Sequence, residues 1–197
     1  MPNLSAIKIG VMKEQMGIAS ENVSKRIIDK KWQDNCLRSI EALTRKHKNI
    51  HQFFFAVTKK LNKIFSISAA ILVLHSNRDH SLRVIDIKKA GYSGEALSLI
   101  LPDKDSLLYS VYRDETIFSE SDPDKFNGNF LERKLLLDQT TKSLVICPIN
   151  DDGRISGLLC LASSLPSAFN SEGAVFLETI SRQFRSILSR PNGSYTP

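Results

Sequence analysis

The chain has 197 residues, of which 42% are hydrophobic and 24% are charged, a balance typical of a globular protein with one full hydrophobic core. Its longest apolar run, from Ala69 to Leu74, is far shorter than the roughly 18 residues that a transmembrane helix needs. Its N-terminal segment contains no continuous apolar stretch of the signal-peptide type. These properties argue against a membrane protein and predict a cytoplasmic one.

Positive charge is concentrated in the first third of the sequence. The formal net charge is +6, and residues 1–65 contain 13 Lys and Arg against 5 Asp and Glu. Residues 66–197 contain 14 basic and 16 acidic residues. A basic segment of this kind is typical of a solvated helix surface, but it is also compatible with an acidic partner or a nucleic acid.

The three cysteines form no recognisable motif. Cys147 and Cys160 lie in apolar segments, and no Cys-x-x-Cys pair occurs. Such thiols are typical of small buried residues in a reducing compartment. The sequence therefore predicts no disulfide, metal site or cofactor, and thiol-dependent catalysis by Cys147 or Cys160 is kept as the less favoured alternative.

The N-terminal region divides into two parts. Residues 1–28 show no clear period and are expected to form a flexible basic arm. Residues 29–65 contain neither Gly nor Pro, and their apolar residues alternate at spacings of three and four. This pattern predicts one long helix, or two helices that meet near His47–Asn49. The apolar stripe is narrow in the first half, which favours pairing with another helix.

Strand signals follow this helical region. Ser68–His75 and Leu82–Lys88 are predicted to form an antiparallel hairpin around a turn of Ser, Asn, Arg and Asp. A short third strand is expected over Leu97–Leu101, where Pro102 ends it.

Two short helices are predicted in the middle of the chain. The first is expected to be capped by Asp103 or Asp105 and to place Leu107, Leu108, Val111 and Tyr112 on one apolar face. The second is expected over Phe130–Asp138. The segment between them, residues 116–128, is rich in Ser, Asp and Pro and is interpreted as irregular.

The last third gives the clearest pattern. Ser143–Ile149 and Ile155–Ala162 flank an Asp-Gly turn, a strong hairpin signal. Gly157 inside the second strand predicts a close backbone approach. A helix capped by Asn170 then carries an apolar stripe and ends at Pro191, and residues 191–197 are expected to form a tail.

The order of these elements predicts an α+β fold with residues 29–190 as one domain. Its centre is an antiparallel sheet of about five to six strands with helices on both faces, preceded by the long N-terminal helix. The hairpin from Ser143 to Leu161, with Pro148 and Gly157, resembles that of the GAF domain, and Phe169 with the helix after it is similar to the closing helix of that family. The resemblance covers Lys48–Arg190.

The resemblance implies a ligand pocket on one face of the sheet and dimerisation through the terminal helices. We expect the pocket to be formed by aromatic and basic residues that would suit a planar anion. These are Tyr109, Tyr112, Arg113, Phe118, Phe126, Phe130 and Lys142. The residues expected at the dimer interface are Trp32, Cys36, Ile40, Leu43, Phe184, Ile187 and Leu188.

Three chemistries of the family are disfavoured by the residues present. The position of the Asn-Lys pair in cyclic nucleotide-binding members reads Ala162-Ser163-Ser164. No Cys or His occurs from Gly91 to Thr141, where tetrapyrrole-binding members carry them. Methionine-sulfoxide-reducing members use nucleophilic cysteines, which need exposure and a nearby cation, and Cys147 and Cys160 lie on apolar strands.

Three hypotheses about function follow. The first is a non-enzymatic, stand-alone regulatory module that dimerises, acts on a protein partner and has a small-molecule pocket. The second is a regulator that contacts nucleic acid or a protein partner without sequence reading, through basic residues of its N-terminal third. These residues are Lys25, Arg26, Lys30, Lys31, Arg45, Lys46 and Lys48. The third is the thiol-dependent enzyme.

Overall fold

Two helices precede the sheet. In the computed structural model, which describes residues 30–89, 92–93, 98–151 and 153–190, α2 spans Lys30–Lys46 and α3 spans Ile50–Phe65. Of the two predicted forms, one long helix or two helices that meet near His47–Asn49, the structure has the second, because Asn49 caps α3. Its side chain accepts hydrogen bonds from the backbone N–H groups of His51 and Gln52, which have no partner inside the first helical turn.

The strands form one antiparallel sheet in the order β3-β2-β1-β7-β6-β5, and β4 also pairs with β2. The long strands are β1 (Ile67–Ser76), β2 (Ser81–Lys89), β6 (Ser143–Asp151) and β7 (Arg154–Ser163). The short strands are β3 (Tyr92–Ser93), β4 (Leu99–Ile100) and β5 (Phe118–Glu120). Two of these, β3 and β5, were not predicted, and β5 shows that residues 116–128 are not wholly irregular.

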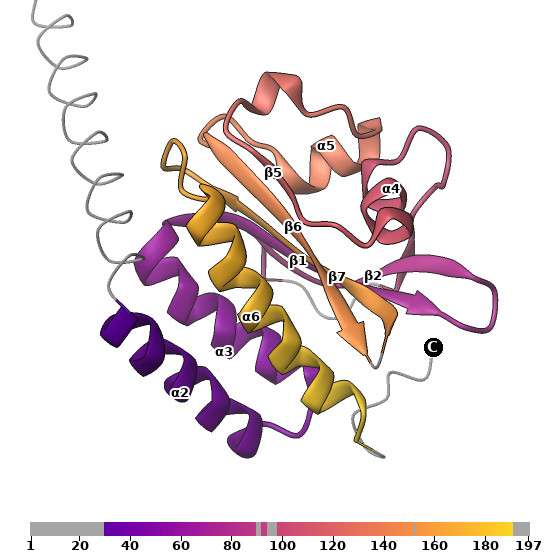
Figure 1. Cartoon of the computed structure of the whole chain (residues 1–197). Coiled ribbons are helices and arrows are strands. Elements are labelled where there is room, and N and C mark those ends of the chain that lie inside the picture. The colour runs from indigo at the N-terminus through magenta and orange to yellow at the C-terminus, as the bar shows by residue number, and fades with distance from the viewer. Residues whose placement is uncertain (1–29, 90–91, 94–97, 152, 191–197) are drawn as a thin grey trace, which may run out of the picture.

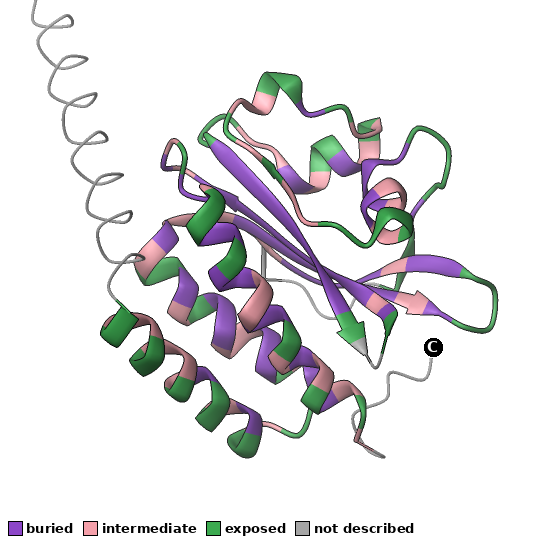
Figure 2. Cartoon of the chain, viewed as in Figure 1, coloured by how far each residue is buried: buried purple, intermediate pink, exposed green. Residues whose placement is uncertain are grey.

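Helices cover both faces of the sheet, as predicted (Figure 1). α2, α3 and α6 (Ser171–Leu188) lie on one face, and α4 (Leu107–Asp114) and α5 (Phe130–Leu136) lie on the other. A 3-10 turn, Pro123–Lys125, precedes α5. Each long strand is buried along most of its length (Figure 2). The predicted α+β fold is therefore confirmed.

Each face has its own apolar core. The α3 and α6 side contains six buried phenylalanines, and Phe53 and Phe184 meet edge to face with ring centroids 4.9 Å apart. The opposite side is filled by smaller residues and by Phe126. Alternation along β6 and β7 supplies both cores, because successive side chains of a strand point to opposite faces.

Gly157 brings β7 close to β1. A Cβ atom at this position would lie 2.2 Å from the carbonyl oxygen of Val73 and 2.8 Å from Cδ2 of Leu74. The predicted close backbone approach is thus confirmed, and any side chain larger than hydrogen would push the two central strands apart.

The described part of the chain has defined limits. The expected arm of residues 1–28 and the expected tail of residues 191–197 lie outside it. Among the described helices, none has the length and apolar character required to cross a bilayer.

Candidate functional site

A cavity of about 600 Å³ lies at one end of the sheet. Its walls come from the end of β1 with the turn after it, from the last turn of α4, and from the β6–β7 turn with the start of β7. The polar side chains that line it include His75, Asn77, Tyr112, Arg113, Glu115 and Arg154.

The strand register brings two of these walls together. β1 and β7 run antiparallel, and Leu74 lies opposite Gly157. The residues that follow β1 and those that begin β7 must therefore meet at the same end of the sheet. Because Gly157 keeps the two strands close, His75 and Arg154 line one cavity although they lie 79 positions apart in the sequence.

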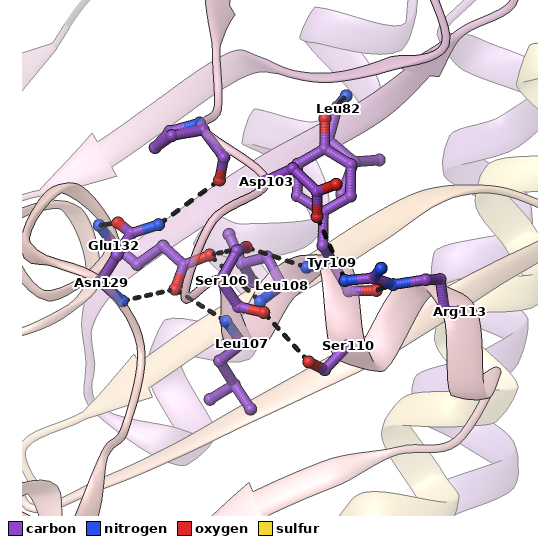
Figure 3. Close-up of polar contacts among 11 residues, drawn as sticks. Leu82, Asp103, Ser106, Leu107, Leu108, Tyr109, Ser110, Arg113, Asn129 and Glu132 are labelled. Atoms are coloured by element: carbon purple, nitrogen blue, oxygen red, sulfur yellow. Dashed lines mark hydrogen bonds and ion pairs between the residues drawn. The ribbon is translucent and has the colours of Figure 1, made fainter.

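The third wall, α4, is fixed by a buried carboxylate (Figure 3). Glu132 of α5 has no exposed surface, and its side chain reaches the first turn of α4. Its oxygens accept hydrogen bonds from the backbone N–H groups of Leu107 at 3.0 Å and Leu108 at 3.1 Å, and from the hydroxyl of Ser106. A carboxylate is favourable there because the first N–H groups of a helix are unpaired and carry partial positive charge.

The carboxylate of Glu132 also caps the N-terminal end of its own helix, α5. The backbone N–H of Asn129 donates to Glu132 Oε2 at 3.0 Å, and the side chain of Asn129 accepts from the backbone N–H of Glu132 at 3.0 Å. This arrangement is a capping box. One side chain thus joins the N-terminal ends of α4 and α5, as Figure 3 shows.

The cap of α4 corrects the sequence prediction. Ser106, not Asp103 or Asp105, is the N-cap, and its Oγ accepts from the backbone N–H of Tyr109 at 3.0 Å. Asp105 has a φ of 54°, in the left-handed region, so its backbone belongs to the preceding turn. Ser106 is selected because its hydroxyl can also donate to Glu132.

Tyr109 then holds α4 against the sheet. Its hydroxyl accepts a hydrogen bond from the backbone N–H of Leu82 on β2 at 2.8 Å. Three residues later in α4, Tyr112 stacks on His75, with ring centroids 5.1 Å apart and an interplanar angle of 16°. The stack joins the wall formed by α4 to the wall formed by β1.

The charges around the cavity are mixed, with two arginines and one glutamate among the described lining residues. Arg113 donates from Nη2 to Asp103 at 3.1 Å and from Nε to the carbonyl of Tyr109 at 3.2 Å. Burial raises the pKa of the Tyr112 hydroxyl, and the carboxylate of Glu115 and the nearby Tyr109 raise it further. Tyr112 is therefore a neutral hydrogen-bonding group at physiological pH.

The structure brings together two of the seven predicted ligand residues, Tyr112 and Arg113. Phe126 is buried in the core beneath α5, and Phe118 packs half-buried against the same core. Phe130 points outward with 79% of its surface exposed. These positions correct the prediction of a single aromatic pocket, because the helix and strand periods send the rings in different directions.

The two remaining predicted residues also lie outside the cavity. Tyr109 uses its hydroxyl to bind β2. Lys142 stands just before the first residue of β6, whereas the cavity lies beyond the last one. A strand of that length spans about 30 Å, so Lys142 and Arg113 cannot contact one small ligand.

The reasoning from sequence missed the other residues that line the cavity, four of which carry long polar or charged side chains. His75, Asn77, Glu115 and Arg154 lie at the ends of strands and of a helix, where the sequence shows only turn signals. One signal could have found two of them. The sequence predicts two hairpins, one with Ser68–His75 as its first strand and one with Ile155–Ala162 as its second. Antiparallel pairing of these two strands places the turn after His75 beside the residues around Arg154.

Three of the seven residues predicted for a dimer interface lie in the core of the chain itself. Ile40, Phe184 and Ile187 are 0% exposed, so they cannot contact a second chain in this structure, and the prediction is corrected for them. α2 packs on α6, where the rings of Trp32 and Phe176 have centroids 5.7 Å apart. Trp32, Cys36, Leu43 and Leu188 remain half-buried at the edge of this packing.

The cysteines are in environments that oppose thiolate formation. Cys147 and Cys160 are fully buried on opposite faces of the sheet. Burial raises the pKa of both thiols well above its ordinary value, with smaller contributions from Glu178 at Cys147 and from Cys147 and Glu132 at Cys160. Burial also raises the pKa of the Cys36 thiol, and Lys60 partly opposes this.

Comparison with known proteins decides the family. A family model described as the GAF domain matches residues 49–188, which cover the chain from the cap of α3 to the end of α6. The chain belongs to the GAF domain family. The resemblance seen in the sequence is thereby confirmed, and the family is one of signalling and regulatory modules. No curated protein sequence matches this chain.

Solved structures share the fold of this GAF domain. The GAF domain of a phosphoenolpyruvate-protein phosphotransferase from Acinetobacter is 18% identical, with a TM-score of 0.64 over 79% of this chain and 92% of that one. The free methionine-R-sulfoxide reductase from Neisseria meningitidis, solved with its substrate, is 15% identical, with a TM-score of 0.63 over 80% and 88%. The GAF domain of a sensor histidine kinase from Bacillus halodurans is 18% identical, with a TM-score of 0.55 over 68% and 90%.

These similarities concern the fold. Regulatory domains and an enzyme occur among the structural neighbours, so the fold does not by itself decide between the two roles. The residues of this chain have to decide it.

Proposed function

We propose that this GAF domain is a non-enzymatic regulatory module that binds a small ligand in the cavity at the end of the sheet. The observation that carries the proposal is the cavity itself, which joins the end of α4 to the ends of β1 and β7. Its volume of about 600 Å³ lies within the range of small-molecule sites. A ligand there would contact α4 directly and so change the packing of that helix on the sheet.

The side chains support a binding role over a catalytic one. Nucleophilic catalysis by cysteine needs a partly exposed thiol whose pKa is lowered by a nearby cation. Cys147 and Cys160 are buried, and burial raises their pKa. Within the described residues, no group of three His, Cys, Asp or Glu could hold a metal ion.

Two measurements on the purified chain test this proposal. Thermal unfolding in the presence of nucleotides, amino acids, oxo-acids and sugars should reveal a ligand that raises the melting temperature saturably, because a ligand bound to the folded state stabilises it. Labelling of native thiols should be slow at Cys147 and Cys160. Fast labelling of either residue, together with turnover of a substrate, would show that the chain is an enzyme.

We further propose a homodimer formed by the outer surfaces of α2 and α6. A groove of about 360 Å³ runs between these helices and is lined in part by Leu37, Val175 and Phe176. Val175 is 61% exposed, and an exposed apolar groove is a frequent contact surface. Light scattering of Val175→Glu should give the mass of a monomer. Phe130→Glu, at an exposed apolar position of α5 on the opposite face of the sheet, is the control that keeps the dimer. A monomeric wild type would refute this.

Nucleic-acid binding is the second candidate, and the structure separates its residues. Lys30 and Lys31 lie in the first turn of α2, whereas Arg45 and Lys46 lie in the last turn, about 25 Å away. Arg45 pairs with Glu41 at 3.0 Å. Basic residues at a helix C-terminus also interact favourably with the helix dipole, so Arg45 and Lys46 have a structural role in α2. Lys25 and Arg26 lie outside the described residues. Binding to random duplex DNA at low salt would support this candidate instead.

The location and the partner also remain proposals. Cys36, Cys147 and Cys160 are unpaired, and free thiols suit the reducing cytoplasm. A regulatory GAF module would pass its signal to a protein partner through the terminal helices, whose packing a ligand would bias.

A further inference from the structure

We infer that the ligand of the cavity at the end of the sheet is a small molecule with a carboxylate or phosphate group, bound by Arg154 together with Arg113 and Tyr112. This inference rests on the proposed function and names the chemistry of its ligand. Three observations on the cavity wall carry it.

The first observation is the state of Arg154. It lies at the first position of β7, lines the cavity and is exposed. Its guanidinium has no ion pair and no hydrogen bond with the described residues, so its five N–H donors have no partner in that part of the chain. A guanidinium presents these donors in a planar fork that matches the two oxygens of a carboxylate or phosphate.

The second observation is that Arg113 is held in place on one side only. Its Nη2 contacts Asp103 and its Nε contacts the Tyr109 carbonyl, and its guanidinium carbon lies 6.0 Å from the centre of the Tyr109 ring. These contacts restrict the side chain before any ligand arrives. Its Nη1 donates no hydrogen bond to a described residue. A pre-positioned arginine loses less conformational freedom on binding, which favours affinity.

The third observation concerns the neutral donors. Tyr112 lines the cavity and stacks on His75, and its hydroxyl makes no hydrogen bond within the described part of the chain. Asn77 of the β1–β2 turn also lines the cavity without such a bond. An anion that met the two guanidinium groups would therefore find uncharged donors beside them.

Glu115 sets a limit on the ligand. It is the acidic residue among the described lining residues and is exposed. It would weaken, without preventing, the binding of a dianion that approached it, whereas it would attract the ammonium group of a zwitterion. Two kinds of source therefore share the proposed chemistry: free anions, such as phosphate or dicarboxylates, and zwitterions, such as α-amino acids.

The test is thermal unfolding of the full chain at constant ionic strength. The probes are inorganic phosphate, pyrophosphate, succinate and L-glutamate, with sodium chloride as the reference and adenosine and glucose as neutral probes. We expect at least one charged probe to raise the melting temperature saturably. Arg154→Ala should lower the affinity for that probe at least about tenfold, because a hydrogen bond to a charged group is lost. Arg113→Ala should lower this affinity less.

Matched variants make the result specific. Arg182→Ala removes the same charge from α6, where Arg182 pairs with Glu178, and should leave the affinity unchanged. Arg154→Lys should retain part of the affinity, which separates a binding defect from misfolding. Glu115→Gln should raise the affinity for phosphate or succinate. If a zwitterion is the ligand, the same substitution should lower the affinity for L-glutamate.

The outcomes separate the two proposals. Saturable stabilisation by a neutral probe, unchanged in Arg154→Ala, would overturn the anionic chemistry and keep the proposed ligand-binding module. A shift with charged probes that does not saturate, or that is the same in Arg154→Ala and Arg182→Ala, is a salt effect and would overturn this inference. Saturation by none of the probes, charged or neutral, would overturn both.

Discussion

Two buried carboxylates lie on opposite faces of the sheet and are satisfied to very different degrees. Glu132, on the α4 and α5 side, is 0% exposed and accepts four hydrogen bonds, from Ser106, Leu107, Leu108 and Asn129. Asp86, on β2 facing α3, is 1% exposed. Its Oδ2 lies 2.8 Å from Nδ1 of His51, and its Oδ1 has no partner among the described residues.

The difference shows how the two faces are built. Long apolar helices hold the α3 and α6 side, so a poorly satisfied carboxylate is tolerated there at a cost. The described helices of the α4 and α5 side are short, and a fully satisfied carboxylate joins them. A buried polar group of this kind stabilises when every donor is paired and destabilises when one partner is lost.

The largest expected effect is that of Glu132→Ala. The substitution leaves four buried or half-buried donors without a partner and should lower the free energy of unfolding by about 3–5 kcal/mol. Glu178→Ala on α6, where the carboxylate is exposed to solvent and pairs with Arg182, is the control and should change it little. Chemical denaturation of the two variants measures both values.

A smaller effect on the same network is expected for Gly128→Ala. The added Cβ would lie 2.5 Å from Glu132 Oε2 and 2.5 Å from Cε1 of Phe126. Both side chains are buried, so the overpacking should cost about 1–3 kcal/mol. In the Glu132→Ala background the cost should fall, because one of the two clashing atoms is gone. Additive effects in this double-mutant cycle would contradict the contact.

The fold could be predicted from local patterns because local patterns specify most of it. The break at His47–Asn49, the Asp-Gly hairpin and the Asn170 cap each depend on a few neighbouring residues. The close approach at Gly157 is made to β1, but a glycine inside an apolar strand was enough to predict it. β5 was missed because its three residues, Phe118–Glu120, are too few to show a period. Ser106 was missed as a cap because its advantage over Asp103 comes from a hydroxyl contact to Glu132.

The site was harder to predict for a related reason. Tyr112 and Arg113 were found because they lie next to each other at the end of one helix. His75 and Arg154 join them only through the pairing of β1 with β7. Phe126 and Phe130 were included because aromatic residues suit pockets, but a buried ring and an exposed ring cannot line the same cavity.

Asp86→Asn should have a smaller effect and the opposite sign to Glu132→Ala. Burial raises the pKa of Asp86 above its ordinary value of 3.8, although His51 opposes this. A carboxylate with a raised pKa destabilises the fold at any pH above that pKa. The asparagine variant should therefore be more stable than wild type at pH 7. Its advantage should shrink as the pH falls through the raised pKa towards 3.8, and a less stable variant at pH 7 would show that the pairing with His51 outweighs the burial.

The smallest effect, with the reverse dependence on pH, is expected for Asp138→Asn at the end of α5. Burial acts to raise the pKa of Asp138, but hydrogen bonds from Thr140 and Thr141 outweigh it and hold the pKa below 3.8. The stabilisation from this carboxylate is complete above pH 3.8 and is lost as the pH falls through the lowered pKa. Asp138→Asn should therefore be less stable than wild type at pH 7, and the two should converge at low pH. Urea unfolding of the Asp86 and Asp138 variants across the same pH series should give differences from wild type of opposite sign. The same sign for both would mean that satisfaction of the carboxylate oxygens is not what distinguishes the two faces.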